Sequence, residues 1–105
     1  DVLSDAAAAL VGGLGLAPSG CFGDDYAYFE SAHGTAPDLA GRNVINPTAT
    51  LLSAVMMLEH LGCGEGARRL EGAIERVYAE GRSLTPDQGG SASTTGFCDA
   101  VRAAL

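Results

Sequence analysis

The sequence of 105 residues contains no lysine, no tryptophan and no initiating methionine. Without lysine, the chain has no P-loop, no Schiff-base amine and no lysine general base. The formal net charge of −7 argues against nucleic acid as the main partner. The composition, 47% hydrophobic and 18% charged, is typical of a globular domain. Because the chain begins with Asp1, we expect a fragment or a processed piece of a larger protein.

Cysteine is scarce, and long apolar runs are lacking. Cys21, Cys63 and Cys98 form no C-x-x-C pair, so neither a disulfide framework nor a zinc site is indicated. We therefore expect reduced cysteines in a cytoplasmic protein. The longest apolar stretches, residues 6–11 and 54–58, fall well short of the roughly 20 residues that a membrane span needs. No membrane partner is expected.

Apolar periodicity predicts a helix-rich chain. Asn46 is a good N-cap, Pro47 suits the first helical position, and Gly62 and Gly81 are typical helix ends. The central helix is apolar on so many positions that we expect it to be buried on most sides. The expected helices cover residues 2–11, 47–61, about 65–80, and a last segment that is capped by Thr94 or Thr95.

Strand signals are few. Residues 14–17 are a short apolar run that predicts a brief buried strand, and the aromatic segment 26–32 predicts a second strand. Residues 19–25, 33–46 and 83–93 are expected to be loops or turns because glycine, proline and polar residues gather there. Two short strands do not form a stable sheet alone, so the pattern again indicates part of a larger α/β structure.

Two carboxylates near the start of the chain are candidate metal ligands. Asp1 and Asp5 lie four residues apart, so on a helix their side chains share a face and repel each other. Mg²⁺ or Mn²⁺, which favour carboxylate oxygens, would remove that repulsion. The alternative is a solvated helix start, where acidic residues also suit the helix dipole.

A loop of small residues precedes the central helix and is a candidate nucleotide site. It runs from His33 to Gly41, and small residues let a ligand approach the backbone closely. The Asp38 carboxylate can accept hydrogen bonds from both hydroxyls of an adenosine ribose and would repel a 2′-phosphate. The alternative is an ordinary loop with a surface aspartate. The Rossmann glycine fingerprint is absent, because Pro18 stands where the third glycine should be.

Several recognisable segments follow one another along the chain. They occur in this order: Asp1-Val2-Leu3-Ser4-Asp5, Gly13-Leu14-Gly15-Leu16-Ala17-Pro18-Ser19, Phe29-Glu30, His33-Gly34-Thr35-Ala36-Pro37-Asp38, Ala40-Gly41, Asn46-Pro47-Thr48-Ala49, Ser53-Ala54-Val55-Met56-Met57-Leu58 and Thr85-Pro86-Asp87-Gln88-Gly89-Gly90. Together these segments resemble the C-terminal third of the β-decarboxylating dehydrogenases, the isocitrate/isopropylmalate dehydrogenase family. The resemblance covers essentially the whole chain.

The resemblance implies an α/β chain that is part of the isocitrate/isopropylmalate dehydrogenase-like fold. It implies that residues 1–11 form the edge of a small domain and residues 12–105 the C-terminal part of the large cofactor-binding domain. It also implies NAD, together with Mg²⁺ or Mn²⁺ on Asp1 and Asp5, and a glutamate, Glu30, near the nicotinamide. NADP-using members carry lysine and tyrosine in place of Asp38 and Leu39. The implied cofactor loop consists of His33, Gly34, Thr35, Ala36, Pro37, Asp38, Leu39 and Asn46.

Such enzymes oxidise and decarboxylate a 2-hydroxy acid of the isocitrate or 3-isopropylmalate type. The family's substrate-binding arginines, its catalytic tyrosine and lysine, and a third metal-binding aspartate have no counterpart in this chain. We therefore expect the chain to be inactive alone, and to act in a homodimer or with a complementing N-terminal chain. The alternatives are a non-catalytic regulatory or scaffold subunit of the same fold, and an inactive remnant of the cofactor loop. Which 2-hydroxy acid is used stays open.

Overall fold

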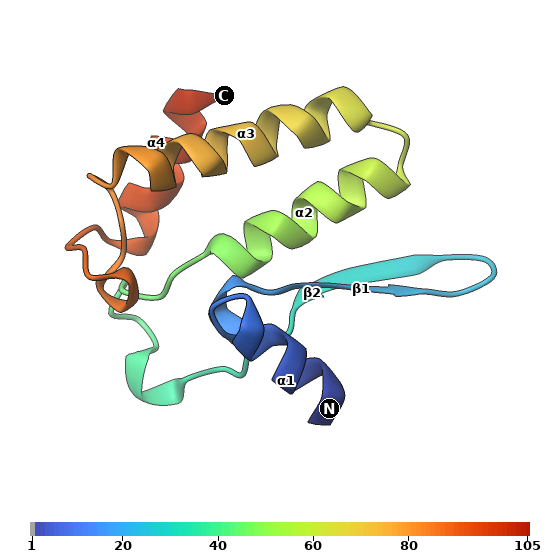
Figure 1. Ribbon diagram of the computed structural model, residues 1–105, viewed down its shortest axis with the longest axis horizontal. Helices are drawn as coiled ribbons and strands as arrows, with labels where there is room; N and C mark the ends of the chain where they lie inside the picture. Colours follow the sequence, from blue (N-terminus) through green and yellow to red (C-terminus); the bar gives the residue numbers. More distant parts are fainter. Residues whose placement is uncertain (1) are drawn as a thin grey trace.

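A computed structural model describes residues 2–105, so Asp1 lies outside the described residues. Four α-helices, three short 3-10 helices and one antiparallel hairpin make up the described part of the chain (Figure 1). The helix-rich α/β expectation is confirmed. In chain order the elements are α1 (Val2–Leu10), η1 (Leu14–Leu16), β1 (Pro18–Phe22), β2 (Ala27–Ser31), η2 (Pro37–Leu39), α2 (Thr48–His60), α3 (Gly64–Glu80), η3 (Pro86–Gln88) and α4 (Thr94–Ala104).

The core lies among the three C-terminal helices. Helices α2 and α3 run side by side, and α4 packs against α3 (Figure 1). Phe97 of α4 is fully buried, and its ring meets that of Tyr78 edge-on with centroids 5.6 Å apart. Burying a phenylalanine contributes about 1.5–3 kcal/mol. The remaining buried apolar members of this cluster are Val55, Ala67, Ala73, Ile74, Val77 and Val101.

The first expected strand is wrong, while the second is confirmed. Residues 14–16 form the 3-10 helix η1, and β1 occupies residues 18–22, most of which were expected to be a loop. Strand β1 forms because it pairs antiparallel with β2, from Pro18 opposite Ser31 to Phe22 opposite Ala27. A Cβ on Gly20 would lie 3.0 Å from the methyl carbon of Met56 and 3.1 Å from the Phe29 ring, so a larger residue would require these side chains to shift.

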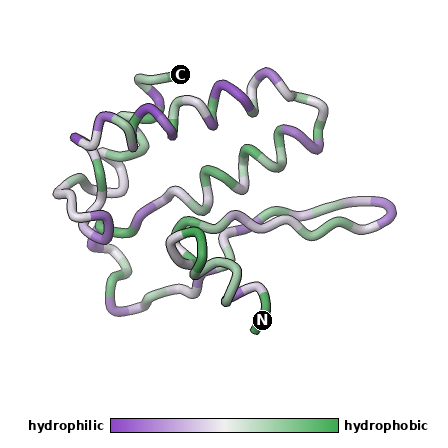
Figure 2. Tube along the Cα trace, in the orientation of Figure 1, coloured by the Kyte–Doolittle hydropathy of each residue, from purple (hydrophilic) through white to green (hydrophobic). Residues whose placement is uncertain are grey.

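Helix α2 is less covered than its composition suggests. Its buried residues are Thr48, Ala49, Ser53 and Val55, whereas Met57 is exposed, so the expectation of burial on most sides is wrong for the described chain. Helix α1 contacts η1 and buries only Ala8. Figure 2 shows hydrophobic residues along both helices and hydrophilic residues at the hairpin tip. Among residues 2–105, no helix is both long and apolar enough to cross a membrane.

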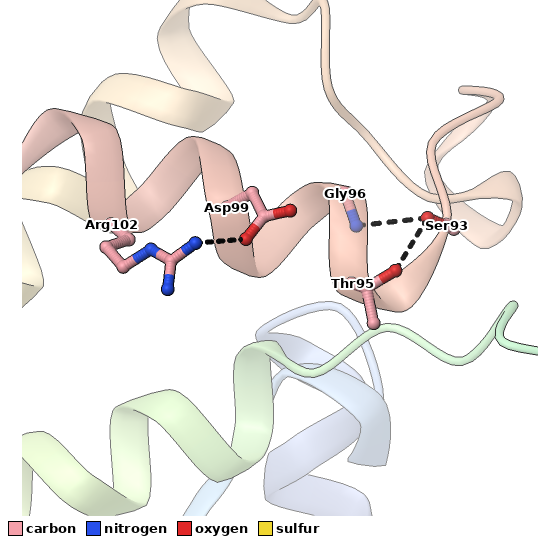
Figure 3. A network of polar contacts seen from close by, with 5 residues as sticks. All are labelled: Ser93, Thr95, Gly96, Asp99 and Arg102. Carbon is pink, nitrogen blue, oxygen red and sulfur yellow. Dashed lines mark hydrogen bonds and ion pairs between the residues drawn. The ribbon is translucent and has the colours of Figure 1, made fainter.

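Helix α4 begins with a side-chain cap. Ser93 is the N-cap, one residue before the expected Thr94 or Thr95, and its Oγ accepts a hydrogen bond from the main-chain N–H of Gly96 at 3.0 Å (Figure 3). Further along the helix, Arg102 forms an exposed ion pair with Asp99 at 2.8 Å (Figure 3). The cap satisfies a main-chain donor that the first helical turn leaves free.

Candidate functional site

A cavity of about 650 Å³ lies between the loop that follows β2 and the segment around η3. This volume is within the usual range of small-molecule sites, about 300–1,000 Å³. Most of the wall comes from loop residues, many of them small, so the backbone is accessible to a ligand. The lining residues are Gly15, His33, Gly34, Thr35, Ala36, Leu39, Arg42, Val44, Ile45, Asn46, Pro86 and Asp87.

The loop is tightly turned where it borders the cavity. Ala36 has φ 42° and ψ 62°, a left-handed conformation that is strained for a residue with a Cβ. Its carbonyl accepts the N–H of Leu39 at 2.9 Å and starts η2. The His33 Nδ1 atom lies 2.8 Å from the carbonyl oxygen of Gly34, so the tautomer with hydrogen on Nδ1 donates there. These bonds hold a conformation that an isolated loop would rarely adopt.

Three hydrogen bonds hold the second half of this loop against the start of α4. The Thr94 N–H donates to the Asn43 carbonyl at 3.0 Å, and the Thr95 N–H donates to Asn43 Oδ1 at 3.1 Å. Asn43 Nδ2 in turn donates to Thr95 Oγ1 at 2.9 Å. Asn43 has φ 57°, a left-handed conformation that asparagine tolerates better than most residues. The start of α4 therefore fixes the position of the loop.

Asn46 is the centre of a polar network at the start of α2. Its Oδ1 accepts from the Thr48 N–H at 3.0 Å and from the Thr48 hydroxyl at 2.6 Å. Its Nδ2 donates to the Tyr78 hydroxyl at 3.2 Å and to Asp87 Oδ2 at 3.0 Å. Asn46 and Thr48 are both buried. The expectation of Asn46 as the N-cap and Pro47 as the first helical residue is wrong by one residue, because Pro47 is the N-cap and α2 starts at Thr48. The Asn46 side chain nevertheless accepts the Thr48 N–H.

The Asp87 carboxylate collects three donors. Thr85 Oγ1 donates to one oxygen, and Asn46 and Gln88 donate to the other at 3.0 and 3.2 Å. Partial burial raises the pKa of the Asp87 carboxyl, but the hydrogen bonds from Thr85, Asn46 and Gln88 outweigh it and hold the pKa below its ordinary value. Asp87 is therefore an anion at neutral pH.

The cavity brings together many of the residues expected in the cofactor loop, but not all. Pro37 and Asp38 lie in η2 beside the lining residue Leu39, and both are exposed. Glu30 is an exposed residue of β2 outside the lining, and its carbonyl accepts a hydrogen bond from Ser53 Oγ at 2.7 Å. The expected residues that line the cavity are His33, Gly34, Thr35, Ala36, Leu39 and Asn46.

Asp5, one of the two expected metal ligands, does not line this cavity. Asp5 is an exposed residue of α1, and Asp1 lies outside the described residues. Within residues 2–105, no group of three or more histidine, cysteine, aspartate or glutamate side chains could hold a metal ion. Because Mg²⁺ requires near-octahedral oxygen coordination, Asp5 can supply only part of such a site.

Sequence reasoning assigned no role to several residues of this site. Asp87 and Tyr78 are separated from Asn46 by 41 and 32 positions, and no local spacing connects them. Arg42 was not assigned a role either, yet it lines the cavity. The one signal for Asp87 was its place in the recognisable segment Thr85–Gly90.

The fold is that of the decarboxylating dehydrogenases. Isocitrate dehydrogenase from Methylococcus capsulatus has the same arrangement, with a TM-score of 0.92 and 44% identity over 98% of this chain and 31% of that one. Residues 1–101 match the family model described as isocitrate/isopropylmalate dehydrogenase. The chain belongs to this family.

Among the curated relatives, the isocitrate/homoisocitrate dehydrogenase of Thermus thermophilus is 57% identical over all 105 residues, which make up 31% of that protein. The alpha subunit of human mitochondrial isocitrate dehydrogenase [NAD] is 52% identical over 96% of this chain and 28% of that subunit. The chain therefore spans about a third of the length of the relatives it matches.

Proposed function

We propose that this chain forms the adenosine-binding side of the cofactor site in an NAD-dependent enzyme that oxidises and decarboxylates a 2-hydroxy acid. The observation that carries the proposal is the cavity of about 650 Å³, because six of its twelve lining residues belong to the expected cofactor loop. The family membership and the human relative named for NAD support the same conclusion.

The cavity suits the adenosine part of NAD in size and chemistry. Small residues at positions 34–36 leave the backbone open to a flat base, and Val44 and Ile45 provide apolar surface. Arg42 is a cation at the same wall, suited to a nearby phosphate. Bound NAD supplies the hydride-accepting chemistry. The residues of this chain bind and orient the cofactor.

Asp38 should determine which cofactor is preferred. It lies in η2 next to Leu39, which lines the cavity, and we expect its carboxylate to lie within reach of the bound ribose. Hydrogen bonds from the free ribose hydroxyls to a carboxylate contribute roughly 1.5–3 kcal/mol. A 2′-phosphate would instead be repelled. We expect a preference for NAD over NADP of at least about tenfold.

The assay requires a complete dehydrogenase that contains this chain. One is obtained by replacing the matched segment of the Thermus thermophilus relative with this chain, and we name this protein the chimeric dehydrogenase. kcat/KM is measured with NAD and with NADP. Asp38→Lys combined with Leu39→Tyr should shift the preference towards NADP, and Asp25→Lys on the exposed hairpin turn is the matched charge control. Equal efficiency with both cofactors in the unmodified protein contradicts the role of Asp38.

Metal, substrate and domain assignments are part of the same proposal. Asp1 and Asp5 would bind Mg²⁺ or Mn²⁺ together with a carboxylate from elsewhere in the enzyme. Helix α1 contacts η1 and is otherwise largely exposed, which supports placing residues 1–11 at the edge of a small domain and residues 12–105 in the large one. The substrate would be of the isocitrate or 3-isopropylmalate type.

Alone, the chain should not turn over substrate and should associate. Leu3 and Leu10 of α1 are 86% and 88% exposed, and Tyr26 in the hairpin turn is 82% exposed. These large apolar side chains are available to pack against another polypeptide. We expect a dimer or pairing with a complementing N-terminal chain. The tests are NAD reduction with isocitrate or 3-isopropylmalate plus Mn²⁺, and light scattering at micromolar concentration. Turnover, or a stable folded monomer, contradicts the respective expectation.

A further inference from the structure

The Asn46 side chain has no hydrogen-bonding position left for a ligand. An asparagine amide has two N–H groups and two lone pairs on its oxygen. Thr48 uses both lone pairs, through its N–H and its hydroxyl, while Tyr78 and Asp87 take the two N–H groups. Asn46 lines the cavity, yet the polar atoms of its amide are fully engaged within the protein.

The direction of every bond in this network is determined. The Thr48 N–H can only donate and the Asp87 carboxylate can only accept, so the amide cannot be flipped. The Thr48 hydroxyl donates its one hydrogen to Asn46 Oδ1. In the 2.6 Å contact between the Thr48 and Tyr78 hydroxyls, the Tyr78 hydroxyl is therefore the donor and Thr48 Oγ1 the acceptor. Asn46, Tyr78 and Thr48 thus form a closed ring with one donor for each acceptor. Asp87 ties this ring to η3.

The ring also joins three parts of the chain that are distant in sequence. Asn46 ends the cofactor loop, Tyr78 belongs to α3, and Asp87 belongs to η3. The Tyr78 ring is itself packed against the fully buried Phe97. An anchor with one end in the core can hold the wall of a cavity in a single position.

We infer that Asp87 is a positioning residue for the cofactor cavity: with Tyr78 and Thr48 it fixes Asn46, so that the wall of residues 44–46 is formed before the cofactor binds. This inference rests on the proposed function. A preformed wall favours binding because less conformational freedom is lost on association. Without the Asp87 acceptor, one N–H of the buried Asn46 amide loses its partner, and residues 44–46 can leave this position.

The test measures KM and Kd for NAD in the chimeric dehydrogenase carrying Asp87→Ala, with Asp99→Ala on the exposed face of α4 as the matched control. We expect Asp87→Ala to raise both constants about tenfold and to change kcat by less than about twofold. Asp87→Asn keeps an oxygen acceptor but loses the charge, so its effect should be intermediate. The control should match the unmodified protein.

A purely structural role would lower the folded fraction, and with it the apparent kcat, but leave KM for NAD unchanged; that result overturns the inference. Tyr78→Phe removes one hydroxyl and keeps the packing on Phe97, and it decides the matter if Asp87→Ala does not fold. A raised KM in this variant supports the inference, and an unchanged KM overturns it. If the unmodified protein does not bind NAD, it is the proposed function that fails.

Discussion

Gly90→Ala should destabilise the chain through a backbone clash. The segment from Leu84 to Ala92 closes on itself, with the Gly90 N–H donating to the Thr85 carbonyl at 3.1 Å and the Ala92 N–H donating to the Leu84 carbonyl at 2.9 Å. A Cβ on Gly90 would overlap the Leu84 carbonyl group. That carbonyl cannot move aside without losing its bond to Ala92. The alanine therefore forces the segment to open.

The magnitude follows from what the opening breaks. Two main-chain hydrogen bonds contribute about 1 kcal/mol each, and overpacking costs about 1–3 kcal/mol, so the free energy of unfolding should fall by about 3–5 kcal/mol. Gly72→Ala is the matched control, because it lies inside α3 with nothing within 4 Å of its added Cβ. Its alanine should stabilise the helix by about 0.5–1 kcal/mol.

The assay is urea unfolding of both variants beside the unmodified chain. A lower free energy of unfolding for Gly90→Ala and a higher one for Gly72→Ala would support the reasoning. A Gly90→Ala variant within about 0.5 kcal/mol of the unmodified chain would refute it, because the closed segment would then open at little cost. In the chimeric dehydrogenase, Gly90→Ala should also weaken NAD binding, since the same segment carries Asp87.

Three further predictions concern single side chains. Ser53→Ala should lower the free energy of unfolding by about 1–3 kcal/mol and speed amide hydrogen exchange in the hairpin. The reason is that the buried Ser53 hydroxyl forms hydrogen bonds with main-chain groups of both strands. Ser91→Ala, at an exposed position, is the control. The stability that the ionised Asp87 contributes should be present above the ordinary aspartate pKa and should be lost as pH falls through the lowered pKa of the folded state. In Asp87→Asn, the free energy of unfolding, measured with urea, should therefore fall less towards about pH 3 than in the unmodified chain. Asn43→Gly keeps the left-handed backbone but removes the side-chain hydrogen bonds to α4, so the free energy of unfolding should fall by about 1–2 kcal/mol in the same assay. An unchanged free energy of unfolding would mean that these bonds do not hold the loop.

The helices could be predicted because their signals are local. Asn46, Pro47 and Gly62 bracket α2 within a residue or two, and the apolar stripe of α3 predicts its length. The N-cap of α4 was missed by one residue, since serine and threonine are neighbours there and all can cap. Periodicity and capping depend only on nearby residues, so they survive without knowledge of the tertiary structure.

Strand β1 could not be predicted, because nothing in its sequence alternates. Proline, serine, glycine and cysteine form a strand there only because β2 lies alongside and Ser53 of α2 accepts the Ser19 N–H at 3.2 Å. The central helix was judged too buried for a related reason. Its apolar residues need surface that the described chain does not supply.

The candidate site divides in the same way. Small residues and the family resemblance predicted the loop that lines the cavity, and Asn46 was expected from its place before Pro47. Asp87 was not, because its link to Asn46 spans 41 positions and exists only in the folded chain. Asp38 is the opposite case, because its sequence matches the expected cofactor loop but the residue lies beside the cavity lining and not in it.

The hydrogen bonds between Asn43 and the start of α4 also determine when, during synthesis of the chain, the loop can take its final position. Asn43 pairs with Thr95 across 52 positions, so the loop cannot be pinned until that threonine has been made. At about 5–20 residues per second, the ribosome needs roughly 3–10 s to add those residues. Closing a short loop takes only about 10–100 ns. For some seconds, the nascent loop is thus free to sample conformations, while helices α2 and α3 can already pair. The Asn43 end of the loop takes its final position only after Thr95 has been made.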